Sequence, residues 1–121
     1  MHYASKAYAK AAKETLTPRE LEASLLLKAA AKLQAVHDSW RDNPAGLSEA
    51  VAYNRKLWTV FIDSVTRDDS QLPAQLRQNL TRLGVFVMGE TFSLMTKPKP
   101  EHVESLIRVN RGIAAGLRGK A

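Results

Sequence analysis

The most constraining feature of the chain is the stretch from Leu47 to Val65, LSEAVAYNRKLWTVFIDSV. Its apolar residues recur at helical steps of three, four or seven, at Leu47, Val51, Trp58, Phe61 and Val65. This spacing places an aromatic-rich stripe on one face of a helix and leaves the charged residues mostly elsewhere. We therefore expect a helix that packs among other helices.

Asparagines interrupt the apolar stripes of two predicted helices. Asn54 lies within the stripe of residues 47–65, and Asn110 lies on the apolar side of the last predicted helix. A buried side-chain amide needs a hydrogen-bond partner. Asn54 therefore either sets the register of a buried contact or marks a partly open face. The two asparagines are expected to find partners in the same core.

Caps and breaks divide the chain into helices. Thr17, Pro18 and Glu20 supply an N-cap, a favoured first helical residue and the acid of a capping box. Prolines and glycines then interrupt the helical pattern near residues 43–46, 72–73 and 97–100. The main helices are predicted at 17–41, 47–68, 73–96 and 100–117, after a short alanine-rich helix or arm at 1–14. The expected fold is all-α, a small antiparallel bundle of four long helices within a single domain, 1–121.

The predicted helix 73–96 is apolar in almost every direction. A core face is marked by Leu76, Leu80, Leu83, Val87, Leu94 and Met95, and further apolar surface comes from Val85, Phe86, Met88 and Phe92. Such a helix is either buried on most sides or exposes a patch for a partner, and the sequence favours burial. Gly84 and Gly89 each lower its helical propensity by about 1 kcal/mol relative to alanine, which indicates close packing or a bend.

Composition narrows the class of protein. A length of 121 residues suits one domain with a single core. The absence of cysteine excludes disulfides and thiolate metal sites and fits a reducing compartment. No apolar run approaches the ~20 residues that span a bilayer, and lysines punctuate the N-terminus where a secretory signal would be apolar. We therefore expect a cytoplasmic protein without membrane insertion.

The formal net charge of +6 is concentrated at the two ends of the chain. Residues 1–13 contain three lysines and no acid, and residues 97–121 contain six bases and two acids. The middle of the chain is close to neutral. The basic ends are the only feature of the sequence that suggests contact with phosphates.

No constellation of residues predicts catalysis. His2, His37 and His102 are far apart in the sequence and lack the spacing that places two imidazoles over a metal. The adjacent acids Asp68 and Asp69 are expected to close a helix in solvent rather than bind a cation. Since there is also no glycine-rich phosphate loop and no nucleophile elbow, we expect no enzyme, no metal and no cofactor.

Four segments of the sequence carry a resemblance to a known family. They are TPRELEASLLLKAAAKLQ (17–34), YNRKLWTVFIDSVTRDDSQLP (53–73), LGVFVMGET (83–91) and KPEHVESLIRVNRGIAAGLRG (99–119). Together they resemble the FlaF family of bacterial flagellar biosynthesis regulators over nearly the whole chain. The resemblance implies a small cytoplasmic, non-enzymatic protein that promotes flagellin synthesis or secretion as a flagellin-directed chaperone, in opposition to the translational repressor FlbT.

The family supplies no contact residues, so a partner site must be predicted from physical chemistry. An amphipathic segment of flagellin is expected to bind an apolar groove, and methionine and aromatic side chains adapt to such partners. The candidates are Trp58, Phe61, Phe86, Met88, Phe92 and Met95. For Trp58 and Phe61, simple burial in the core is an equally good interpretation.

Two other classes of function remain open at this stage. The basic ends favour an RNA-binding regulator of flagellin expression, although no aromatic-interleaved basic platform accompanies them. A scaffold that binds another assembly factor is the third possibility. The sequence does not distinguish action on translation, flagellin stability or export, nor does it give the oligomeric state.

Overall fold

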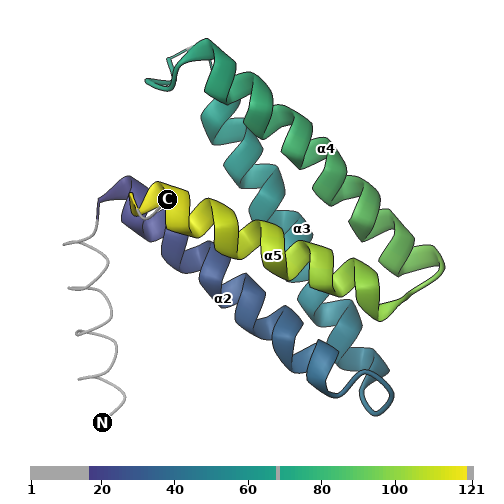
Figure 1. Cartoon of the computed structure of the whole chain (residues 1–121). Coiled ribbons are helices and arrows are strands. Elements are labelled where there is room, and N and C mark those ends of the chain that lie inside the picture. The colour runs from purple at the N-terminus through teal and green to yellow at the C-terminus, as the bar shows by residue number, and fades with distance from the viewer. Residues whose placement is uncertain (1–16, 68, 120–121) are drawn as a thin grey trace, which may run out of the picture.

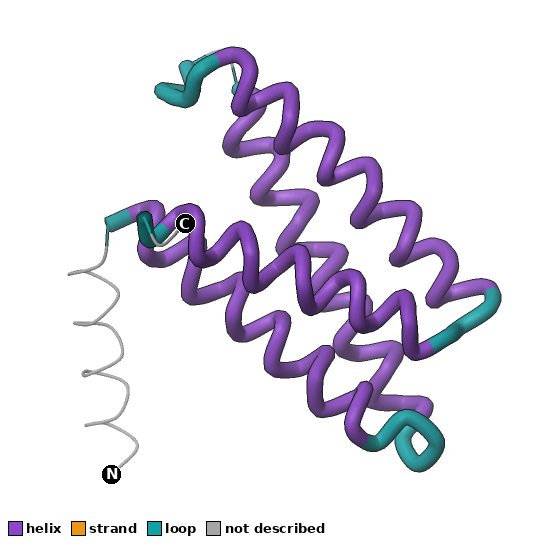
Figure 2. The backbone as a smooth tube through the Cα atoms, in the orientation of Figure 1, coloured by secondary structure: helices purple, strands orange, loops and turns teal. Residues whose placement is uncertain are grey.

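The computed structural model describes residues 17–67 and 69–119. Its helices are α2 (Pro18–Asp38), α3 (Pro44–Thr66), α4 (Ala74–Thr96) and α5 (Pro100–Leu117), and Figure 2 shows loops but no strand between them in this part of the chain. The prediction of an all-α fold with four long helices is confirmed. The predicted N-terminal helix or arm at 1–14 lies outside the described residues.

Capping side chains and prolines determine where the helices begin. Thr17 Oγ1 accepts a hydrogen bond from the backbone N–H of Glu20 at 3.1 Å, and Glu20 Oε2 accepts one from the N–H of Thr17 at 3.2 Å, which is the predicted capping box. α3 begins at Pro44, three residues before its predicted start, because Asn43 Oδ1 caps the N–H of Gly46 at 2.9 Å. Proline lacks an N–H, so it fits the first turn of a helix without losing a bond.

The four helices run alternately in opposite directions and enclose one core (Figure 1). α2 packs against α3 and α5, α3 packs against α4, and α4 packs against α5. The contact between α2 and α5 is the most extensive, and the contact between α4 and α5 is smaller than that of α3 with either α2 or α4. Figure 1 shows α4 standing away from α5 at the end of the molecule where α4 begins and α5 ends. We call this the open end.

A buried polar network ties three helices together at the centre of the core. Asn110 on α5 donates through Nδ2 to Asn54 Oδ1 on α3 at 2.7 Å and to the backbone oxygen of Leu26 on α2 at 3.3 Å. Its Oδ1 accepts from the indole Nε1–H of Trp58 at 2.9 Å. Asn54, Trp58 and Asn110 have no exposed surface. The expectation that the two asparagines find partners in the same core is confirmed.

Two local contacts hold α4 against its neighbours. A Cβ added at Gly84 would lie 2.8 Å from Ile62 Cδ1, so only glycine allows α3 and α4 to approach this closely without movement of Ile62. On the other side, Glu90 Oε2 pairs with His102 Nδ1 of α5 at 2.7 Å. The close packing predicted at Gly84 is confirmed. Gly89 shows none, since nothing lies within 4 Å of its Cβ position.

Candidate functional site

The open end contains a cleft of about 520 Å³. Its walls are the first turns of α2 and α4, the last turns of α3 and α5, and the loop from Asp69 to Leu72. All four helices contribute because α4 diverges from α5 there and the side chains of the other three helices do not fill the space. We call this space the end cleft.

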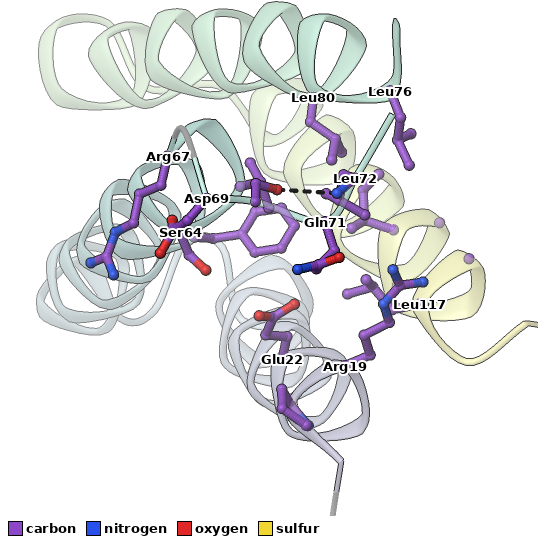
Figure 3. Close-up of a pocket in the computed structure, with 17 residues that line it drawn as sticks. Arg19, Glu22, Ser64, Arg67, Asp69, Gln71, Leu72, Leu76, Leu80 and Leu117 are labelled. Carbon is purple, nitrogen blue, oxygen red and sulfur yellow. Dashed lines mark hydrogen bonds between the residues drawn. The ribbon is translucent and has the colours of Figure 1, made fainter. Parts of the chain in front are cut away.

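The end cleft has an apolar floor and a polar rim. The floor is formed by Phe61, Val65, Leu72, Leu76, Leu80, Ile113 and Leu117. The rim carries charged and amide groups, and Figure 3 shows Arg19 and Glu22 projecting from α2 toward the loop that bears Gln71. On the α5 wall, Gly112 and Gly116 stand beside Ile113 and Leu117, and there is open space at the Cβ positions of both glycines. A helix that enters the cleft therefore meets leucine side chains of α4 on one wall, and on the α5 wall it meets Ile113 and Leu117 with open space at the two glycines.

The environment of Glu22 in the end cleft perturbs the titration of its carboxyl group. Burial raises the pKa of the Glu22 carboxyl above its ordinary value, and the nearby positive charge of Arg19 partly opposes that shift. Among residues 17–67 and 69–119, Glu22 forms no ion pair. Its raised pKa means that a cation brought into the cleft by a ligand would stabilise the ionised carboxylate.

The structure distributes the six predicted site residues over three places. Trp58 is fully buried in the core and packs edge-to-face on Phe61, with ring centroids 5.4 Å apart. Phe61 is also buried, but its edge forms part of the floor of the end cleft. The four candidates on α4 lie on the outside of the bundle or at its margin. Whether any of the six binds a partner stays a prediction.

Three of the α4 candidates lie on one face and the fourth does not. Met88, Phe92 and Met95 follow one another at steps of four and three, so they share one side of the helix. Phe86 lies on the flank that faces α5, one turn before Glu90, which pairs with His102. The structure therefore brings together Met88, Phe92 and Met95 and separates them from Phe86, Trp58 and Phe61.

The expectation that α4 is buried on most sides is wrong. Val85, Phe92 and Met95 expose 70%, 66% and 60% of their surface, and Phe86 exposes 45%. Only one side of α4, with Leu80, Gly84, Val87, Thr91 and Leu94, faces the core. A helix in this arrangement has two neighbours, α3 and α5, so about half of its circumference stays in solvent. Apolar residues on that half form a patch.

The described residues hold no group of three or more histidine, cysteine, aspartate or glutamate side chains able to bind a metal ion. The two histidines in this part of the chain are instead partners of carboxylates that join helices: His37 with Glu104 at 2.9 Å between α2 and α5, and His102 with Glu90. In the same part of the chain, no helix has the length and apolar character needed to cross a bilayer.

Comparison with known protein families shows which family the chain belongs to. The model of one family, described as flagellar protein FlaF, matches residues 4–117, which is nearly the whole chain. The chain belongs to the FlaF family. The resemblance seen in the sequence is thereby confirmed, and it places this FlaF protein among flagellar proteins. No curated protein and no solved structure gives a significant match.

Several residues of this FlaF protein that the sequence marks as core also line the end cleft, and one of them, Leu76, is exposed there rather than buried. Leu76, Leu80, Ile113 and Leu117 follow the apolar stripes of their helices, so periodicity alone marks them as buried. Their role differs because α4 diverges from α5, which is a property of the packing of distant segments. The glycines of α5 were the available signal, since Gly112 and Gly116 remove side chains from a stripe that would otherwise fill the space.

Proposed function

We propose that this FlaF protein promotes flagellin synthesis or secretion, and so filament assembly, by binding flagellin in the cytoplasm as a non-enzymatic chaperone. Membership of the FlaF family supports a flagellar role. The observation that carries the binding proposal is the end cleft, an apolar depression that all four helices line. Amphipathic helices are commonly recognised by apolar grooves of this kind.

The chemistry of the end cleft suits an amphipathic terminal segment of flagellin. Its leucine-rich floor would take the apolar face of the segment, and the open space at Gly112 and Gly116 on the α5 wall leaves room for bulky side chains. Glu22 would receive a basic side chain or the N-terminal end of the bound helix, both of which stabilise a carboxylate. A functional link to FlbT belongs to the same proposal.

The test is co-expression with full-length flagellin and with flagellin truncated at its C-terminus, followed by size exclusion in high salt. Two variants alter the cleft: Leu76→Ser removes an apolar side chain that is 42% exposed, and Gly116→Leu fills open space on the opposite wall. Each is expected to weaken flagellin binding by about tenfold or more, since about 1.4 kcal/mol of lost apolar contact suffices. Val60→Ser, at an exposed position outside the cleft, is the matched control.

Three results would contradict the proposal. Flagellin that never co-elutes excludes direct binding, and a complex that survives both cleft variants excludes the end cleft as its site. Retention of flagellin message in place of flagellin, with a steep dependence on salt, would favour the RNA-binding alternative. Circular dichroism of each variant separates loss of binding from loss of folding.

A further inference from the structure

A second apolar surface runs along the outside of α4, away from the end cleft. It consists of Val85, Met88, Phe92 and Met95, which we call the α4 stripe. Their steps of three, four and three are those of a coiled-coil seam. The stripe extends over about 15 Å of helix at 1.5 Å per residue. Three of its four side chains are at least 60% exposed, which is unusual for large apolar residues that lie together.

The backbone along the α4 stripe is accessible to another helix. Gly89 lies between Met88 and Phe92 along α4, and nothing is within 4 Å of its Cβ position. It contributes no packing to the core and lowers the helical propensity of α4. A glycine on the contact face of a helix lets a second helix approach closely, so its presence fits a helical partner.

The charges around the stripe determine which kind of helix fits. α4 and the segment after it carry exposed bases at both ends of the stripe, Arg82 before it and Lys97 and Lys99 after it. The only acid between them is Glu90, which pairs with His102 of α5. The flanks of the stripe are therefore positive with no free negative charge along α4.

This distribution of charge disfavours a second copy of the chain as the occupant. The stripe is centred on residue 90, so in an antiparallel pair of α4 helices Arg82 would face the Lys97–Lys99 segment of the other copy. In a parallel pair each Arg82 would face its equivalent. Like charges opposed in this way are repulsive in both arrangements.

We infer that the α4 stripe is a docking surface for an amphipathic helix of another protein, with apolar residues at heptad spacing and acidic residues beside them. The apolar seam of that helix packs on Val85, Met88, Phe92 and Met95, and its acidic flanks lie near Arg82 and the Lys97–Lys99 segment. This surface is separate from the end cleft and does not depend on what the cleft binds.

The test uses two synthetic helical peptides of 18 residues or so, with leucine at the seam positions and either glutamate or lysine at the flanking positions. Binding to the full chain is measured by fluorescence anisotropy. We expect the glutamate peptide to bind about tenfold or more tightly than the lysine peptide, a difference that shrinks in high salt. Phe92→Ser and Met95→Ser should each weaken the glutamate peptide by about tenfold or more.

The controls distinguish the stripe from general apolar adhesion. Val60→Ser removes a side chain that is 62% exposed on α3 and should leave peptide binding unchanged. Equal binding of the two peptides, or loss of binding that is the same in Val60→Ser and Phe92→Ser, would overturn the inference. So would sedimentation showing a dimer of the wild-type chain that Phe92→Ser dissociates, because a second copy would then be the occupant.

Discussion

Replacing Asn110 by alanine removes the centre of the buried polar network. The change deletes the bonds to Asn54 Oδ1 and from the Trp58 indole N–H, and it leaves both groups without these partners at positions that have no exposed surface. An orphaned buried polar group costs about 1–3 kcal/mol, so the two together are expected to lower the free energy of unfolding by about 4 kcal/mol. That is a large part of the ~5–15 kcal/mol typical of a domain.

Urea unfolding monitored by tryptophan fluorescence, to which Trp40 and Trp58 both contribute, and by circular dichroism measures the effect. Asn79→Ala is the matched control, because Asn79 is exposed on α4 and bonds only to Gln75 there; it should change stability by less than about 0.5 kcal/mol. A double-mutant cycle with Trp58→Phe should give a coupling energy of about 1 kcal/mol or more. A loss below about 1 kcal/mol for Asn110→Ala would show that the network does not stabilise the core.

Further predictions concern α4 and the end cleft. Gly89→Ala should stabilise the protein by about 1 kcal/mol, because alanine has the higher helical propensity. Gly84→Ala should destabilise it, because the new Cβ meets the side chain of Ile62. Equal effects of the two substitutions on thermal unfolding would contradict both expectations. The raised pKa of Glu22 means that the folded state binds the proton of this carboxyl more tightly than the unfolded state does. The free energy of unfolding should therefore fall as the pH rises from 4.5 through the raised pKa. Glu22→Gln should remove that part of the pH dependence of stability. His102→Ala should leave Glu90 without its partner and cost about 1–3 kcal/mol, with faster hydrogen exchange in α4 than in α2.

Local signals in the sequence were sufficient to predict the helices and part of the core. The capping box at Thr17 and Glu20 and the stripe from Leu47 to Val65 depend only on residues within one or two turns, so they are readable without the rest of the fold. Asn54 and Asn110 were expected to find partners in the same core because each interrupts an apolar stripe, and the structure adds that they bond to each other. The start of α3 was missed because Pro44 was read as a helix breaker, whereas it is the first residue of α3, after the Asn43 cap.

The end cleft was not predictable, because it depends on the angle between helices that are distant in sequence. Leu76 and Ile113 have the same periodicity as core residues of their helices, and only the divergence of α4 from α5 leaves them beside open space. A sequence pattern specifies which face of a helix is apolar, but not whether a neighbouring helix covers it along its whole length.

The departures from expectation gather on α4, and there is a physical reason for this. α4 has a smaller contact with α5, which includes the Glu90–His102 pair, than with α3, where Gly84 lies close to Ile62. A helix is not expected to carry more large apolar residues than its core face needs, since those on its outer side contribute little to folding. Where a sequence carries residues that its fold does not need, function rather than stability generally selects them. The excess of apolar residues on α4 therefore supports both proposals, a partner at the α4 stripe and another at the end cleft that the first turns of α4 line.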